Sequence, residues 1–423
     1  MVARDIVVVR NDIEGRRHTF PMSGEVELVM RWFGRYYSEC PPPPPDRFGR
    51  REFGFMFFDR NYVQRHLSFS KASEIRDFLV RQVPAHVYHS SAYYASPGAP
   101  TMNEKSWLGA DLIFDLDADH LRGVEGMSYP EMLAQVKVAF IRLLDDFLMG
   151  DLGFDESEIR IVFSGGRGYH AHVMSEDVLG LRSHERREIV DYITGTDLEM
   201  EWAFPERASF EKEFGDRKTV QKSRLIPSPG SGGWRGRMRH GLGVILEDLC
   251  SGDLDLVRER YPSTLEVSDR LLKGLMEDLS GSRGGKQVSE LIMDKGNLED
   301  IGGKRRALLL GILENDAVNL MAGQVDEPVT SDIKRLIRMP GSLHGKTSLR
   351  VTQLNREKLD DFDPLRDAVP AVFEDDPVPV SVEERVVGEL GGESFSVEGE
   401  VEVPLRLALF LLCRRQATLT DIG

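Results

Sequence analysis

The sequence predicts a mixed α/β (α+β) protein with a mainly helical insertion in the middle of the chain. Over residues 1–175, segments with strand-like patterns alternate with segments in which apolar residues recur at helical spacing. Residues 176–322 show a mostly helical pattern instead. The chain has 423 residues, of which 41% are hydrophobic, so we expect two or three domains with sizeable cores.

The local patterns predict individual elements in chain order. Helices are predicted where apolar residues recur every three to four positions, over 24–38, 71–82, 128–149, 184–193 and 303–322. Strands or extended segments are predicted over 52–58, 83–94, 159–166 and 348–354. Pro130 suits the first turn of the helix over 128–149, and Pro41–Pro45 form a stiff spacer. Residues 360–423 are expected to form an acidic C-terminal segment with a short terminal helix.

The net charge of −16, from 54 Lys or Arg against 70 Asp or Glu, argues against nucleic-acid binding when it is taken globally. Residues 360–400 hold 13 acidic and 2 basic residues, a balance of −11, and residues 401–423 contribute +1, so residues 1–359 carry only −6. Within 216–240, seven Lys or Arg stand against Asp216 alone. This stretch is either a local anion-binding face or a solvated basic loop.

Cysteine usage indicates the cellular setting. The three cysteines, Cys40, Cys250 and Cys413, are scattered, which argues against a disulfide framework and favours a reducing, cytoplasmic location. The sequence start shows no signal-peptide pattern. The longest apolar run, Leu407–Cys413, is too short to span a bilayer, so we expect no membrane association.

The strongest local signal is the segment 110–120, ADLIFDLDADH. Because side chains alternate along a strand, the apolar side chains fall on one face and the carboxylates of Asp111, Asp115, Asp117 and Asp119 on the other. Clustered carboxylates repel one another, and they are the ligands that Mg²⁺ or Mn²⁺ prefers. We expect Asp115 and Asp117 to bind metal, whereas Asp111 and Asp119 lie at the strand ends and need no such role. The alternative is a solvent-facing edge strand with incidental acids.

A glycine-rich loop and a basic run supply two further signals. The strand over 159–163 leads into SGGRGYHAHV, 164–173, whose backbone N–H groups could cradle phosphate, with Arg167 and His170 as further donors. The alternative is a tight turn between two strands. The run 325–351 carries several cations behind Asp326, and Pro328 blocks a helix that would begin before it. A third carboxylate beside Asp115 and Asp117 would complete a two-metal site, while the alternative for this run is a surface amphipathic helix.

Together these segments resemble the small, catalytic subunit of archaeal and eukaryotic DNA primase. The resemblance is carried by REFGFMFFDRNYVQRHLSF, HSSAYYASPGAPTMNEKSWLGADLIFDLDADH, SGGRGYHAHV and VDEPVTSDIKRLIRMPGSLHGKTSLRV, in the family's order and spacing. It implies a primase-type catalytic module that is discontinuous over 1–175 and 323–359, with 176–322 as an inserted helical subdomain. The resemblance is weakest over 360–423, whose role stays open.

The resemblance also implies roles for individual residues. The catalytic metal ligands for Mg²⁺ or Mn²⁺ would be Asp115, Asp117 and Asp326. The nucleotide-binding residues would be Ser164, Arg167 and His170 of the triphosphate motif and the pair Arg338 and His344, with Lys346 nearby.

The activity implied is that of a nucleotidyltransferase, a DNA-directed primase that makes short RNA primers, or DNA primers as well, during replication. Its partners would be nucleoside triphosphates, a single-stranded DNA template and a primase large subunit, which carries an iron–sulfur cluster in this family. Many archaeal members have a Cys/His zinc knuckle after the acidic strand, but residues 120–160 hold His120 and no cysteine, so no structural zinc is expected. Two alternatives stay open: a related polymerase of end-joining or gap-filling repair, and a non-catalytic nucleic-acid-binding subunit.

Overall fold

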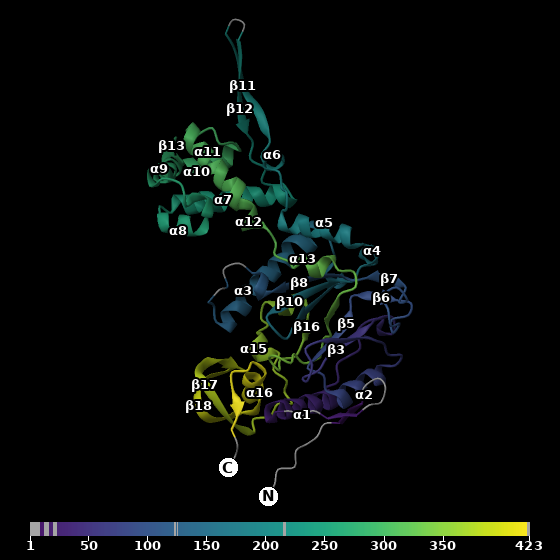
Figure 1. Ribbon diagram of the computed structural model, residues 1–423. Coiled ribbons are helices and arrows are strands. Elements are labelled where there is room, and N and C mark those ends of the chain that lie inside the picture. Colours follow the sequence, from purple (N-terminus) through teal and green to yellow (C-terminus); the bar gives the residue numbers. More distant parts are fainter. Residues whose placement is uncertain are drawn as a thin grey trace. The chain divides into compact units, whose positions relative to one another are not determined.

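The computed structural model describes residues 9–11, 17–19, 23–121, 124, 126–214 and 217–420. The chain divides into two compact units, Met1–Glu188 with Gln324–Gly423, and Ile189–Gly323. The first unit is mixed α/β and holds two four-stranded sheets (Figure 1). The observed fold is therefore of the predicted mixed class.

The first sheet has the order β16-β9-β10-β8, and every neighbouring pair is antiparallel. Its strands are β8 (Leu112–Asp117), β9 (Ile159–Phe163), β10 (Gly168–Val173) and β16 (Thr352–Leu354). As the alternation predicts, the apolar side chains of β8 are buried, while Asp115 and Asp117 are only partly covered. Helix α3 (Tyr129–Arg142) packs on β10 and β8 and continues as a π-helical segment, Leu143–Asp151.

The second sheet has the order β15-β5-β3-β4, again antiparallel throughout. Its strands are β3 (Phe53–Met56), β4 (Val63–Leu67), β5 (His86–Ser90) and β15 (Leu336–Arg338). Residues 336–338 are therefore a strand, and not part of a surface helix. A small ladder joins β6 (Ala92–Tyr94) to β7 (Trp107–Ala110), and β1 (Val9–Asn11) pairs with β2 (Arg17–Thr19).

The remaining helices of the first unit are α1 (Gly24–Glu39), α2 (Ala72–Gln82), α4 (Glu176–Leu179), α13 (Glu327–Ser331), α14 (Arg356–Leu359) and α15 (Pro364–Asp367). Among them, α1 and α2 lie over the predicted ranges 24–38 and 71–82. Helix α3 begins where expected, because Ser128 and Glu131 form a capping box and Pro130 lies in its first turn. Helix α5 (Ser183–Thr194) crosses the boundary between the two units.

The acidic C-terminal segment folds as a long hairpin followed by the predicted apolar helix. Strands β17 (Pro377–Leu390) and β18 (Glu393–Pro404) pair with each other, and β19 (Thr418–Leu419) pairs with β17. Helix α16 (Leu405–Cys413) is apolar and packs against β17, β18 and α1. The sequence did not predict the hairpin, because charged residues interrupt the alternation of apolar and polar side chains that identifies a strand.

The second unit is mainly helical, with the helices α6 (Met200–Ala203), α7 (Gly233–Cys250), α8 (Leu254–Arg260), α9 (Asp269–Ser280), α10 (Val288–Lys295), α11 (Gly303–Ile312) and α12 (Val318–Met321). It also holds the hairpin β11 (Glu206–Phe214) and β12 (Arg217–Arg224) and the short pair β13 (Ser282–Arg283) and β14 (Lys286–Gln287). Of the predicted basic stretch, Asp216 and the side chains up to Ser223 lie outside the described residues. Over the described ranges, no helix is both long enough and apolar enough to cross a membrane.

Candidate active site

Three carboxylates predicted as metal ligands come from two segments that meet at one sheet edge. Asp115 and Asp117 lie on β8, and Asp326 is the residue that precedes helix α13. The backbone N–H of Asp326 donates to the carbonyl oxygen of Asp115 at 3.0 Å. Val329 of α13 packs on Ile113 of β8 and Ile337 of β15. This apolar contact holds the segment that carries Asp326 against the strand that carries the other two carboxylates.

Asp115 has an unusual environment. Burial raises its pKa to about 7, and the negative charges of Asp117 and Asp326 add to the effect. Its Oδ1 lies 3.5 Å from Nε2 of His170, the residue opposite it on β10. Burial lowers the pKa of His170 to about 3, with further repulsion from Arg338 and Arg335. The imidazole is therefore neutral at pH 7, and the contact with Asp115 is not an ion pair.

The donor chemistry of these carboxylates fits Mg²⁺ or Mn²⁺. Within the described residues, no three His, Cys, Asp or Glu side chains converge closely enough to hold a metal ion by themselves. Mg²⁺ commonly takes one or two protein carboxylates together with water and substrate phosphates, so Asp115 and Asp117 are the residues that could hold it. Burial is the main cause of the raised pKa of Asp115, and a divalent cation would relieve the repulsion from Asp117 and Asp326 that adds to it.

The glycine loop over 164–168 is closed by its own serine. The hydroxyl oxygen of Ser164 accepts from the N–H groups of Gly166 at 3.2 Å and Gly168 at 3.3 Å. These two N–H groups thus have partners inside the loop, and not all of the backbone donors expected from the sequence point outward. Gly168 is required sterically, since a Cβ there would lie 2.4 Å from the carbonyl oxygen of Leu116 on β8.

Arg167 extends from this loop toward the carboxylates. One terminal nitrogen of its guanidinium lies 3.5 Å from Asp117 and also bonds to Asp119. A cation therefore lies beside the repelling carboxylates in this structure, which is what the clustering on β8 requires. Asp119 is more exposed than Asp117 and does not line the cavity described below.

The basic run over 325–351 brings Arg338 and His344 to the same site. Arg338, on β15, bonds to Nδ1 of His86 at 2.7 Å and to the hydroxyl of Tyr88 at 3.3 Å. His344 is buried and lies over the glycine loop, because Thr347 beside it donates to the carbonyl of Gly165 at 2.5 Å. Burial and the nearby cations, Arg338 first among them, hold the pKa of His344 well below its usual range. This imidazole is also neutral at pH 7.

A single cavity of about 1020 Å³ collects most of the predicted site. Of the predicted site residues, its lining includes Asp115, Asp117, Ser164, Arg167, His170, Arg338, His344 and Lys346. Asp326 does not line it, although its charge acts on Asp115. The lining also includes Arg335 of the basic run. Arg414 and Arg415, from the C-terminal segment, line the cavity as well, and the sequence did not predict them as site residues. No local pattern distinguishes those two arginines from surface arginines at a helix end.

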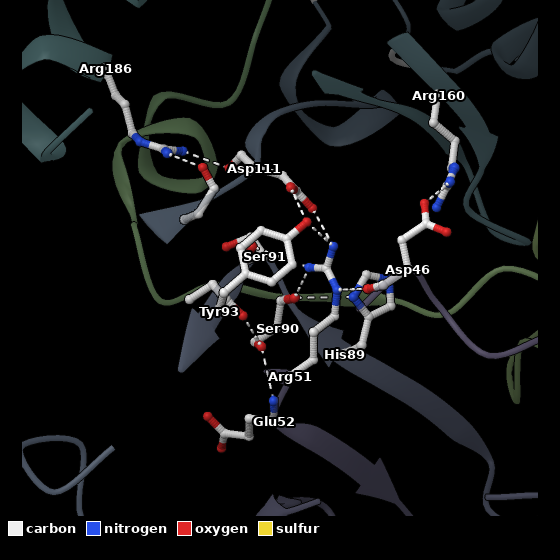
Figure 2. Close-up of polar contacts among 12 residues, drawn as sticks. Asp46, Arg51, Glu52, His89, Ser90, Ser91, Tyr93, Asp111, Arg160 and Arg186 are labelled. Atoms are coloured by element: carbon white, nitrogen blue, oxygen red, sulfur yellow. Dashed lines mark hydrogen bonds and ion pairs between the residues drawn. The ribbon is translucent and has the colours of Figure 1, made fainter. Parts of the chain in front are cut away.

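A buried polar network, which we call the clamp, lies at the start of strand β8 (Figure 2). It consists of Arg51, Tyr93, Asp111 and Arg186. Arg51 donates to the carboxylate of Asp111 at 2.7 Å and to the hydroxyl of Tyr93 at 2.6 Å, and Tyr93 in turn donates to Asp111. Arg186 donates to the backbone carbonyls of Ala110 and Asp111, each at 2.8 Å. Because Arg51 lies two residues before β3 of the second sheet and Asp111 directly precedes β8 of the first, the clamp ties the two sheets together. Asp111 is thus structural.

Comparisons with known proteins identify the family. The family described as DNA primase small subunit matches residues 114–356. The DNA primase small subunit PriS of Methanocella arvoryzae is 45% identical over 394 residues, covering 91% of this chain and 96% of that protein. PriS of Methanococcoides burtonii is 41% identical over 397 residues, with the same shares of both chains.

This chain belongs to the DNA primase small subunit family. The predicted family and the predicted role as a primase subunit in DNA replication are confirmed. Among solved structures, the polymerase domain of Mycobacterium tuberculosis Ligase D in complex with DNA covers 79% of this chain and 83% of its own, with 12% identity. The TM-score of this match is 0.30.

Proposed function

We propose that this chain catalyses primer synthesis on a single-stranded DNA template by nucleotidyl transfer. A 3′-hydroxyl attacks the α-phosphorus of a nucleoside triphosphate, and pyrophosphate leaves. The observation that carries this proposal is the composition of one cavity, whose lining combines the carboxylates of β8 with cations of the glycine loop and the basic run. Nucleotidyl transfer needs both groups, because carboxylates hold the metal ion and cations bind the oxygens of the triphosphate.

The residues of the cavity divide the work. Asp115 and Asp117, with Asp326 beside them, would hold Mg²⁺ or Mn²⁺, which when bound lowers the pKa of the attacking hydroxyl and neutralises the leaving phosphates. Arg167 and Arg338 would bind the triphosphate oxygens through charge-assisted hydrogen bonds, supported by Lys346.

The buried histidines would act as neutral hydrogen-bonding groups. Burial lowers the pKa of both His170 and His344, so neither carries a charge that competes with the arginines. Ser164 would act through the loop, because its hydroxyl holds the backbone of Gly166 and Gly168 in place.

We also propose that a primase large subunit assists this chain. A net charge of −16 opposes a polyanionic template, and priming requires a template and two nucleotides to be held at once. A template-holding partner would supply the contacts that this acidic chain lacks.

The test is the variant Asp117→Asn, which removes one charge at similar volume. We expect it to abolish synthesis on unprimed single-stranded DNA while the protein remains folded, because the metal anchor loses a carboxylate. The matched control is Asp177→Asn, an exposed Asp on α4, which should keep normal activity. Near-normal synthesis by folded Asp117→Asn would refute the assignment. Gap filling on a recessed 5′-phosphate end, without unprimed synthesis by the wild type, would favour a repair polymerase.

A further inference from the structure

The C-terminal segment brings two arginines to the cavity from a part of the chain with no assigned role. Helix α16 is almost entirely buried, and the chain leaves it at Arg414 and Arg415. Arg415 has a φ of 58°, which turns the backbone at the helix end. Both residues line the cavity that contains Asp115 and Arg167.

Arg414 is held in place by apolar and aromatic contacts. Its guanidinium lies over the ring of Tyr129 at 4.2 Å and near the ring of Phe410 at 5.2 Å. Its Nε donates to the side-chain oxygen of Gln416 at 2.9 Å. Throughout the described parts of the chain, no carboxylate pairs with Arg414 or Arg415, and no group accepts from the terminal nitrogens of Arg414.

This arrangement leaves a cation electrostatically unsatisfied. Burial lowers the pKa of Arg414, and repulsion from Arg167 lowers it further, while only the ring hydroxyl of Tyr129 opposes this. Two guanidinium groups that repel each other across a cavity are stabilised when an anion lies between them. Among the residues that the structure describes, Arg414 has no carboxylate partner, and an arginine in this state beside a cavity indicates a ligand that is itself anionic.

Tyr129 links this cation to the glycine loop. Its hydroxyl donates to the carbonyl oxygen of Gly166 at 2.5 Å. The ring that Arg414 contacts is therefore hydrogen-bonded to the glycine loop, next to Arg167. The guanidinium is thus positioned near the glycine loop, which carries Arg167, one of the residues proposed to bind the triphosphate.

We propose that Arg414, with Arg415 beside it, forms a phosphate-binding subsite for the terminal phosphates of the incoming nucleoside triphosphate. This inference rests on the proposed function. It assigns the C-terminal segment 377–420 a part in nucleotide binding, because the hairpin and α16 hold Arg414 against Tyr129. The shared chemistry is phosphate recognition by a pre-positioned guanidinium, and phosphates of the template strand are the other source that the experiment must separate.

The experiment measures binding of a ribonucleoside triphosphate, the corresponding monophosphate and a single-stranded DNA to the full chain in Mg²⁺, by calorimetry. Arg414→Gln removes the charge at similar length and should weaken triphosphate binding about tenfold or more, with less than a threefold effect on the monophosphate. The matched control is Arg385→Gln on β17, which removes the same charge from the same segment outside the cavity. Arg414→Lys keeps the positive charge and should retain most of the affinity for the triphosphate. It also shows whether the fold tolerates a substitution at residue 414.

The outcomes separate the inference from the function on which it rests. Equal triphosphate binding by wild type and Arg414→Gln would overturn the subsite while leaving the proposed function intact. Loss of single-stranded DNA binding in Arg414→Gln beyond that in Arg385→Gln, with triphosphate affinity unchanged, would assign the arginine to the template and also overturn the proposal. A wild-type chain that binds no triphosphate would overturn both.

Discussion

The clamp offers a sharp test of how this fold positions its carboxylates. Arg51 and Asp111 are each 1% exposed, and Arg51 makes five hydrogen bonds, to Asp46, Ser90, Ser91, Tyr93 and Asp111. Breaking a buried ion pair by removing one partner leaves the other charge uncompensated, at a cost of about 3–5 kcal/mol. We therefore expect Arg51→Met to lower the free energy of unfolding of the first unit by about that amount.

A double-mutant cycle separates the pair from its surroundings. Asp111→Leu alone leaves Arg51 buried without its carboxylate, whereas Arg51→Met with Asp111→Leu removes both charges together. The double variant should recover about 1–3 kcal/mol relative to the sum of the single losses, since residues in contact couple by about this much. The surface control is Arg366→Met, whose ion pair with Asp367 is half-exposed and should contribute less than about 1 kcal/mol.

Hydrogen exchange is the appropriate assay, because the chain has two units and a global unfolding curve would mix them. Amide protection in β8 and β3 reports the first unit, and both strands should lose protection together, since the clamp joins their sheets. A loss below about 1 kcal/mol in Arg51→Met, or strict additivity in the cycle, would refute the reasoning.

Two further predictions follow from the charges. The pKa of Asp115 is raised from 3.8 to about 7, so the folded protein retains a proton that the unfolded chain has lost, and its stability falls as the pH rises from about 4 to about 7. The stability of Asp115→Asn relative to the wild type should therefore increase by up to about 3 kcal/mol between pH 5 and pH 8, measured by amide hydrogen exchange in the first unit with a chelator present, and a stability difference independent of pH would contradict this. The lone chain should bind single-stranded DNA weakly with a shallow salt dependence and bind it more tightly with the large subunit; tight binding with a steep salt slope by the chain alone would argue against a template-holding partner.

The sequence alone determined the local parts of this site. The alternation over 112–117 predicted strand β8 with its carboxylate face, since that pattern depends only on near neighbours along a strand. The short helix α13, which begins at Glu327, one residue before Pro328, was not predicted from the sequence. The resemblance to primases then grouped residues that lie far apart in the chain.

Only the tertiary structure decided which side chains meet. Asp111 has the same alternating spacing as Asp115 and Asp117, but its carboxylate is buried in an ion pair with Arg51, 60 positions away in the sequence. Arg414 contacts Tyr129, which hydrogen-bonds to Gly166 of the glycine loop, although the sequence shows at this point only two cations after a mainly apolar helix. Periodicity records which face of an element is buried. It does not record which distant element covers that face, because the partner is selected by packing of the whole chain and not by the local sequence.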